Sequence, residues 1–316
     1  MPNTFSYVLS NACAGRLECY VRLFFTRSIR KAFTRLWDPL VRYDLDGTTI
    51  QIPLSHDLPL HRRIFPQYNT GLPRIAAQVA GKYPDATIID IGANVGDTVA
   101  VLRKAVQCPI LCIEGDARFL DVFKKNAPAF TGVELEESYV GPSETEGGFA
   151  SASSGGTARL EKTAAGAGSA GVRMKTLSEI LQQRPAFKDC RLLKIDTDGF
   201  DTLIVRSELD LLARLKPVIF MEYDPYFQAR IGEDGLAALE ALRSIGYRAA
   251  IVFESWGDYL QCADLGNRSL LEDLHSYYSG RKSLRYCDIC LFHEQDDDLA
   301  RQVRLNELQF AAQTRR

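Results

Sequence analysis

The sequence lacks the features that define several large classes of protein. Lysine and arginine number 38 against 40 aspartates and glutamates, so the formal net charge is −2 and no global positive field favours nucleic acid. No stretch reaches the roughly 18 apolar residues that a transmembrane helix needs. Residues 1–15 lack the basic segment and the unbroken apolar core of a secretory signal. These absences predict a cytoplasmic protein with no nucleic-acid partner.

Cysteine is present, but without the regular spacing of a disulfide framework. The 8 cysteines are scattered along 316 residues, a pattern typical of reduced and mostly buried thiols. Cys287 and Cys290 form a CxxC pair, yet no second pair completes a zinc site. Both also fall in a strand-like run, in which residues three apart point to opposite faces. We therefore predict structural cysteines and assign no metal ligands.

The chain divides into three predicted regions. Residues 1–80 form an N-terminal extension, 81–295 a core domain and 296–316 a C-terminal helical tail. Within the extension, apolar residues recur at helical spacing over 16–37, with basic residues around them. We interpret this segment as a helix that packs on the domain or on a second subunit of a homodimer; peripheral contact with a membrane surface is the alternative. Alternation around an Asp-Gly pair then predicts a hairpin over 41–53.

From residue 87 onward, apolar strands alternate with helices of about 10–15 residues, which predicts a parallel sheet. The last two strands are longer and have no comparable helix between them, which suits an antiparallel pair. The expected fold class is α/β: a Rossmann-like, seven-stranded, mostly parallel sheet with helices on both faces. The expected strands are 87–91, 109–114, 133–135 with 139–140, 192–196, 217–222, 247–254 and 286–293; the expected helices are 96–106, 117–127, 176–183, 200–214 and 233–244.

One segment of the core domain, 141–171, consists mostly of glycine, alanine, serine and threonine. Such a composition buries too little apolar surface to offset the entropy lost on ordering, so we predict a mobile loop. It follows the third strand, on the side of the sheet where ligands bind. For that reason a lid over the site is favoured over plain disorder.

A glycine-rich turn follows the first strand of the core domain. The strand delivers Asp90 to its carboxyl end, and the chain then turns at Gly92 and Gly96 into a helix. Gly92 permits a tight turn, Gly96 permits close approach of ligand and helix, and the start of the helix offers free backbone donors. A plain strand-to-helix turn would look the same. Glu114 supplies the context, because an acid at the end of the second strand can accept hydrogen bonds from both ribose hydroxyls of a nucleoside.

Two nucleoside ligands compete for this turn. The spacing Gly92-x-Asn94-x-Gly96 is not the GxGxxG pattern that cradles the pyrophosphate of NAD. S-adenosylmethionine has no phosphate, and its ammonium and sulfonium groups suit a nearby carboxylate such as Asp90. The sequence therefore favours S-adenosylmethionine as the cofactor, and a methyltransferase over a nicotinamide-dependent oxidoreductase.

A second polar group lies at the end of the fourth strand, beside the first. Lys194 and Asp196 alternate with apolar residues, so both side chains point to one face. They form either a satisfied ion pair or a general base with a clamp for a substrate hydroxyl. Asp196, Asp198 and Asp201 are also the type of ligand that Mg²⁺ prefers, but acids around a glycine turn serve as helix caps too.

Two further residues are candidates for catalysis. Glu222 follows four apolar residues at the end of the fifth strand, where a charge is costly unless it is paired or used. His56 is one of only 4 histidines; we interpret it as a surface residue, with a base near the mouth of the pocket as the alternative.

Four motifs in this order resemble the FkbM family of S-adenosylmethionine-dependent methyltransferases, from about Val41 to His293. They are Asp90-x-Gly-Ala-Asn-x-Gly-Asp-Thr98, the acid Glu114, Leu193-Lys-Ile-Asp-x-Asp-Gly-Phe-Asp201 and Ile219-x-x-Glu222. The resemblance implies a Rossmann-like methyltransferase domain that acts on hydroxyls of sugars or polyketides. It therefore implies a glycan or small-molecule acceptor and a place in polysaccharide biosynthesis.

The resemblance also assigns roles to single residues of this sequence. The residues implied in cofactor binding are Asp90, Gly92, Ala93, Asn94, Gly96, Thr98, Glu114 and Gly115. The catalytic candidates are Asp196, Lys194, Glu222 and His56. Asp198 and Asp201 stand where the family often has Glu, which leaves the contacts to the acceptor open. The alternatives are a Mg²⁺-assisted methyltransferase and a noncatalytic module that only binds S-adenosylmethionine.

Overall fold

The computed structural model describes residues 30, 33–34, 36–142, 149–154, 157–162, 174–280 and 285–314. Most of the helix predicted over 16–37 and much of the loop predicted over 141–171 lie outside these residues. In the latter segment, β7 (Phe149–Ser154) and β8 (Thr157–Lys162) pair as an antiparallel hairpin. The predicted loop therefore contains a hairpin, in which strand pairing satisfies the backbone groups.

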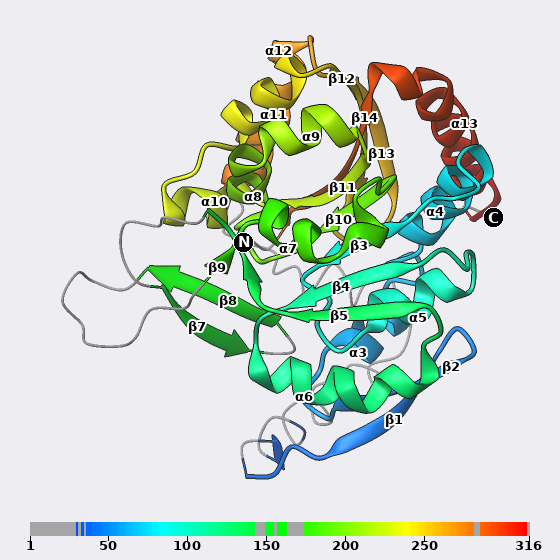
Figure 1. Ribbon diagram of the computed structural model, residues 1–316, viewed down its shortest axis with the longest axis vertical. Coiled ribbons are helices and arrows are strands. Elements are labelled where there is room, and N and C mark those ends of the chain that lie inside the picture. Colours follow the sequence, from blue (N-terminus) through cyan, green and yellow to red (C-terminus); the bar gives the residue numbers. More distant parts are fainter. Residues whose placement is uncertain are drawn as a thin grey trace, which may run out of the picture.

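The core is an eight-stranded sheet in the order β13-β12-β14-β11-β10-β3-β4-β5 (Figure 1). Five neighbouring strands from β11 to β5 are parallel, and β14, β12 and β13 pair antiparallel. The predicted fold class is confirmed, with one edge strand more than expected. The strands are β3 (Ile88–Ile91), β4 (Ile110–Glu114), β5 (Val133–Glu137), β10 (Leu192–Ile195), β11 (Val218–Tyr223), β12 (Tyr247–Glu254), β13 (Tyr259–Asp264) and β14 (Cys287–His293).

Three details of the predicted elements are wrong. A helix of 12 residues, α12 (Arg268–Ser279), lies between the last two predicted strands, where no comparable helix was expected. The dipeptide strand β6 (Tyr139–Val140) does not continue the third strand of the sheet, but pairs with β9 (Met174–Lys175) outside it. The helix predicted over 200–214 is broken into α8 (Asp201–Ser207) and α9 (Leu209–Leu215). Glu208 lies at the break, where its buried carboxylate accepts hydrogen bonds from the backbone and hydroxyl of Ser178.

Helices cover both faces of the sheet, because side chains of each strand alternate between two apolar clusters. One cluster packs against α7 (Leu177–Gln183), α8, α9, α11 (Gly235–Ser244) and α12 (Arg268–Ser279). The other packs against α4 (Gly71–Lys82), α5 (Asp97–Arg103), α6 (Ala117–Asn126) and α13 (Asp297–Thr314). Two further α-helices of the described residues are α3 (Leu58–Ile64) and α10 (Pro225–Ile231). Cys287 and Cys290 are free, buried and divided between the two clusters, as predicted.

The predicted hairpin over 41–53 is confirmed as β1 (Leu40–Leu45) and β2 (Thr48–Pro53). Asp46 and Gly47 both have positive φ, at 54° and 93°, which matches the tight turns that join right-twisted strands. The hairpin joins the same apolar cluster as α5 and α6. Asn126 of α6 fixes it there, since its side chain bonds both the amide and the carbonyl of Gln51 and also donates to Val95 O.

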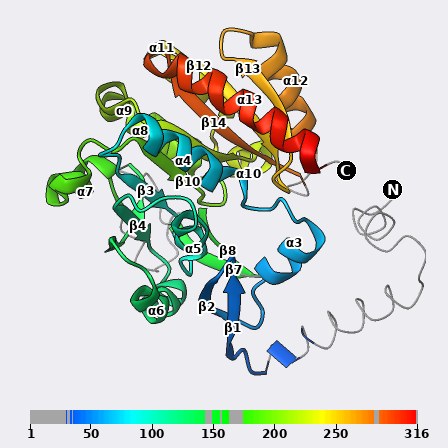
Figure 2. The same ribbon diagram turned by 90° about the vertical axis from the view of Figure 1, so that its right-hand side faces the viewer.

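At the opposite end of the chain, α13 lies beside α4 (Figure 2). A bidentate salt bridge joins the two helices: Arg74 Nε donates to Glu307 Oε1 at 2.8 Å, and Arg74 Nη2 donates to Glu307 Oε2 at 2.5 Å. The Glu307 side chain is fully buried, so this charge pair fixes the two helices against each other. None of the helices in the described ranges combines the length and the apolar character that crossing a bilayer demands.

Candidate functional site

A cavity of about 460 Å³ opens at the carboxyl ends of β3, β4, β10 and β11. The strand order reverses between β3 and β10, which is the position where open α/β sheets bind ligands. Among the residues predicted for the site, those that line the cavity are His56, Gly92, Asn94, Thr98, Glu114, Gly115, Lys194, Asp196 and Glu222. The other three predicted residues, Asp90, Ala93 and Gly96, are buried and do not line the cavity; they belong to the end of β3 and the loop that follows it.

The glycine-rich loop between β3 and α5 is held by neighbouring backbone. Gly92 has φ 81°, and the amides of Gly92 and Ala93 both donate to Ile113 O on β4. Gly96 also has positive φ, at 87°, but a Cβ there would lie 2.6 Å from the ring of Phe130. The expectation that Gly96 makes room for a ligand is therefore wrong; it makes room for an aromatic side chain of the core.

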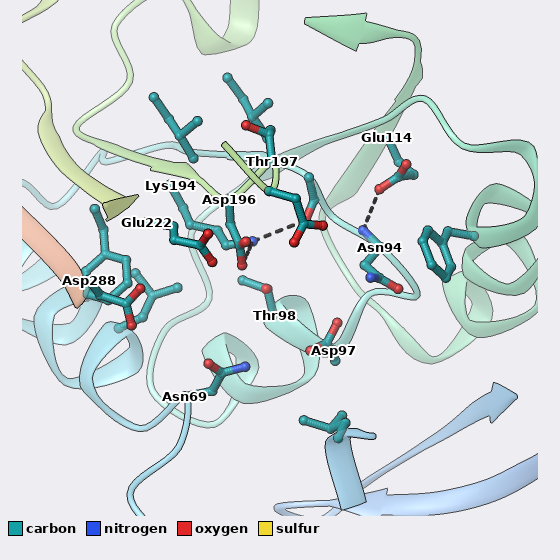
Figure 3. A pocket seen from close by; sticks show the side chains of 18 of the residues that line it. Asn69, Asn94, Asp97, Thr98, Glu114, Lys194, Asp196, Thr197, Glu222 and Asp288 are labelled. Carbon is teal, nitrogen blue, oxygen red and sulfur yellow. Dashed lines mark hydrogen bonds and ion pairs between the residues drawn. The ribbon is translucent and has the colours of Figure 1, made fainter. Parts of the chain in front are cut away.

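Three backbone amides hold the carboxylate of Glu114 at the end of β4. Its Oε2 accepts a hydrogen bond from the amide of Asn94 at 2.8 Å. Its Oε1 accepts from the amides of Gly115 and Asp116 at 2.9 and 2.7 Å. Burial raises the pKa of Glu114, and these backbone donors act in the opposite direction. The carboxylate is thus fixed against the glycine-rich loop, facing the cavity (Figure 3).

Lys194 links the ends of β3 and β10. Its Nζ lies 2.9 Å from Asp90 Oδ1, 3.4 Å from Asp196 Oδ2 and 3.2 Å from Gly92 O. Burial lowers the pKa of Lys194. The carboxylates of Asp90 and Asp196 raise it by more, so the pKa lies above its ordinary value. Burial also raises the pKa of Asp90, which is fully enclosed. Two carboxylates and one carbonyl thus surround the ammonium, which favours the cationic form of Lys194 and connects the ends of β3 and β10.

The acids after β10 have different surroundings. The Asp196 side chain is 51% exposed and faces the cavity (Figure 3). Asp201 is buried, and its two oxygens accept from the amides of Thr197 and Gly199 at 3.2 Å each. Asp201 therefore stabilises the turn; it does not cap α8, whose N-cap residue is Phe200 and which has no side-chain cap hydrogen bond. Among the residues the structure describes, no group of three or more His, Cys, Asp or Glu side chains is arranged to hold a metal ion.

Glu222 has an acidic neighbour that the sequence analysis missed. Asp288 of β14 lies directly opposite Glu222 of β11 in the antiparallel register, and both line the cavity. Burial, followed by the charge of Asp196, raises the pKa of Glu222 and of Asp288 well above the ordinary carboxyl range. The signal was present in the sequence, since Asp288 interrupts an apolar strand. Its place at the site depends on β14 running antiparallel to β11, which brings the first residues of β14 to the ligand edge.

His56 is not the surface residue that we expected. It is 8% exposed and lines the cavity, because the turn before α3 folds over the site. Its Nδ1 accepts a hydrogen bond from the amide of Leu58 at 3.2 Å. In the neutral ring, Nε2 then carries the proton, so His56 can donate a hydrogen bond in this arrangement but cannot act as a base.

Aromatic side chains complete the wall of the cavity, and the sequence analysis missed them as well. Tyr68 precedes α4, Trp256 follows β12 and Tyr286 precedes β14. Trp256 stacks on Phe65 with ring centroids 3.9 Å apart, which fixes the indole. These residues come from turns distant from the glycine-rich motif, and no local pattern marks them.

The fold and the position of the cavity define an α/β protein with a nucleoside-type crevice at the switch point of its sheet. The profile of the family described as "Methyltransferase FkbM domain" matches residues 90–249, about half of the chain. The chain therefore belongs to the FkbM family of S-adenosylmethionine-dependent methyltransferases. None of the curated proteins matches the chain.

Several solved structures are similar to this chain at low identity. A precorrin-6y C5,15-methyltransferase from Geobacter metallireducens GS-15 has 12% identity and TM-score 0.38, with 71% of this chain and 88% of that chain covered. A methyltransferase FkbM from Methylobacillus flagellatus KT has 11% identity and TM-score 0.34, covering 52% and 39%. The N-methyltransferase NodS from Bradyrhizobium japonicum WM9 has 10% identity and TM-score 0.39, covering 75% and 97%. At such low values these likenesses say nothing about the acceptor.

Proposed function

We propose that this protein transfers the methyl group of S-adenosylmethionine to a hydroxyl of a sugar, a glycan or a related natural product, in polysaccharide biosynthesis. The observation that carries the proposal is the cavity that joins Gly92 and Glu114 on one side to Asp196 and Glu222 on the other. Donor and acceptor must share one space, because the reacting atoms have to meet in a fixed orientation. The choice of a glycan rests on the family resemblance alone.

The residues of the donor half fit S-adenosylmethionine. That molecule carries a sulfonium and an ammonium, and the charged lining is mostly acidic, with Lys194 its only lysine or arginine within the described ranges. Glu114 Oε2 accepts one backbone bond, and a carboxylate oxygen has two acceptor positions, which leaves one for a ribose hydroxyl. The residues that we propose to contact S-adenosylmethionine are Gly92, Asn94, Thr98, Glu114 and Gly115.

The chemistry divides between the donor and the side chains around it. Bound S-adenosylmethionine supplies a methyl group on a sulfonium, which is already a good leaving group. Asp196 accepts the proton of the acceptor hydroxyl, because it is the carboxylate at the switch point that solvent and substrate can reach. Lys194 is a positioning residue that holds Asp196, Asp90 and the Gly92 carbonyl together.

Asp196→Asn tests the proposal. An amide cannot accept the proton, so we expect turnover to fall by about 100-fold or more. Affinity for S-adenosylhomocysteine in calorimetry should stay within about twofold. The readout is S-adenosylhomocysteine formed from S-adenosylmethionine with a panel of sugar acceptors. Asp189→Asn is the matched control, because Asp189 is exposed near the opposite end of the same strand. Unchanged turnover in Asp196→Asn would remove Asp196 from the mechanism.

The same assay separates the alternatives. Loss of activity with EDTA and recovery with Mg²⁺ would show metal assistance. Binding of S-adenosylmethionine without formation of S-adenosylhomocysteine by any acceptor would show a noncatalytic module. We also propose a cytoplasmic location, which the free thiols of the described cysteines support.

A further inference from the structure

We propose that the acceptor carries a positively charged group, such as a protonated amine, close to the hydroxyl that is methylated, and that Glu222 and Asp288 bind this group. The inference rests on the proposed function above and names a property of its acceptor. It concerns the part of the cavity beside β11 and β14, away from the glycine-rich loop.

The geometry of the two carboxylates is set by the sheet. Glu222 and Asp288 are directly paired residues of antiparallel strands, and such residues have Cβ atoms about 4.5–5.5 Å apart on one face. Both side chains point into the cavity on the same side of it (Figure 3). Two carboxylates at this spacing can share one cation of the size of an ammonium or a guanidinium.

Among the described residues, no lysine or arginine forms an ion pair with Glu222 or Asp288, although the charge of Lys194 lowers the pKa of Asp288 in part. Lys194 is the only lysine or arginine among the described residues that line the cavity, and its Nζ is already paired with Asp90 and Asp196 and donates to Gly92 O. Glu222 is 8% exposed, and among the described residues no hydrogen bond or ion pair engages its carboxylate. A carboxylate this deeply buried is costly without a partner. A cationic ligand removes that cost, whereas an anionic one adds to it.

The raised pKa values of both acids agree with this arrangement. Burial is the largest cause for each, and nearby negative charges add to it. Burial, together with the charges of Glu222 and Asp288, also raises the pKa of Tyr68 and of Tyr286. Tyr68 and Tyr286 line the same cavity as the two acids and supply aromatic rings to its wall. Aromatic faces next to carboxylates are a common setting for organic cations.

Three sugars that differ only at C6 provide the test. They are 6-amino-6-deoxyglucose, glucose and glucuronic acid, which carry a cation, no charge and an anion on one ring. Dissociation constants are measured by ligand-observed NMR at pH 8, with the full chain saturated with S-adenosylhomocysteine. We expect the amino sugar to bind about tenfold tighter than glucose, equivalent to about 1.4 kcal/mol. Glucuronic acid should bind at least tenfold more weakly than glucose.

Neutral variants localise the effect. In Glu222→Gln and in Asp288→Asn, the preference for the amino sugar should fall to about threefold or less, with glucose affinity within twofold. Asp273→Asn is the control, because Asp273 is an exposed acid on α12, and it should keep the full preference. Thermal unfolding of all three variants checks folding. Glu222→Gln removes a buried carboxyl group and Asp288→Asn a half-buried one next to it, so neither variant is expected to lower the melting temperature.

Four outcomes would overturn the inference. They are similar affinity for the three sugars, no binding of the amino sugar, a preference that survives in both variants, and a loss of S-adenosylmethionine affinity relative to S-adenosylhomocysteine in Glu222→Gln. The last would assign the pair to the sulfonium of the donor. If the wild-type chain does not bind S-adenosylhomocysteine, the proposed function fails first. If it binds and the cation preference is absent, only this inference fails.

Discussion

Gly92 lies so close to Asp196 that a Cβ built on Gly92 would stand 1.8 Å from the Asp196 backbone oxygen. In addition, the amide of Asp196 donates to Ile91 O at 3.0 Å. The chain leaving β3 is therefore in direct backbone contact with the chain leaving β10. Because one of these segments forms the proposed donor loop and the other carries the proposed base, this contact sets the position of one relative to the other.

Gly92→Ala should disrupt this contact. The new methyl group meets backbone rather than a movable side chain, and φ is 81°, a value that side chains disfavour. We expect the free energy of unfolding to fall by about 3 kcal/mol or more, together with loss of S-adenosylhomocysteine binding. Gly81→Ala is the matched control: a Cβ at this exposed position in α4 meets nothing within 4 Å, and alanine favours a helix by about 1 kcal/mol. Equal behaviour of the two variants in urea unfolding would contradict the argument.

Glu114→Gln and Glu114→Ala should both weaken the binding of S-adenosylhomocysteine. The amide of Gln would face backbone N–H groups that now donate to the carboxylate, and Ala removes the acceptor entirely. Hydrogen bonds to a charged group are worth about 1.5–3 kcal/mol, so a loss of about 10- to 100-fold is expected in calorimetry. Glu137→Ala is the control, because Glu137 is the register partner of Glu114 on β5 but is exposed. Wild-type affinity in Glu114→Ala would disprove the ribose assignment.

The part of the site on the first two parallel strands could be predicted from the sequence. An apolar strand that ends in Asp90, a glycine turn and an acid at Glu114 are local signals, and parallel strands place their carboxyl ends at one edge. The same rule brings Lys194, Asp196 and Glu222 to that edge. The ion pair of Lys194 with Asp90 was not predicted, because pairing across strands depends on register, which periodicity does not encode.

The rest of the site depends on long-range packing. Asp288 reaches the edge only because β14 enters between β12 and β11 in the antiparallel direction. His56 is buried because the turn before α3 folds onto the core. The space beside Gly96 is filled by the ring of Phe130, which lies between α6 and β5. None of these contacts leaves a local pattern in the sequence.

The Asp90–Lys194 pair should behave as one coupled unit. Asp90 is fully buried and its Lys194 partner nearly so, and removal of one member of a buried pair leaves an uncompensated charge. Asp90→Leu and Lys194→Met are each expected to cost about 3–5 kcal/mol in urea unfolding. The double variant should cost less than their sum, with a coupling of about 1–3 kcal/mol.

The exposed pair of Arg243 and Glu240 on α11 is the control for that cycle, since solvent screens it. We expect no measurable coupling there. Additive effects at Asp90 and Lys194 would show that the two charges act separately.

Stability should fall with increasing pH because of Asp201. Burial, followed by the charge of Asp196, raises the pKa of Asp201 to about 7, whereas an unfolded aspartate has a pKa of about 3.9. A pKa that is higher in the folded state means that the folded state binds the proton more tightly. Asp201 therefore stabilises the fold fully below about pH 4, and this contribution is lost as the pH rises to about 7. Urea unfolding between pH 4.5 and 8 measures it.

Asp201→Asn removes this titration and keeps an oxygen for one of the two backbone donors. Its free energy of unfolding should decline less steeply with pH than that of the wild type. The free energy of unfolding of Asp201→Asn should still decline with increasing pH, because the pKa values of Glu222 and Asp288 are raised as well. Asp210→Asn, an exposed acid on α9, should reproduce the wild-type slope. Parallel profiles for the wild type and Asp201→Asn would show that Asp201 is already ionised in the folded protein at low pH, and that the turn after β10 binds the charged form.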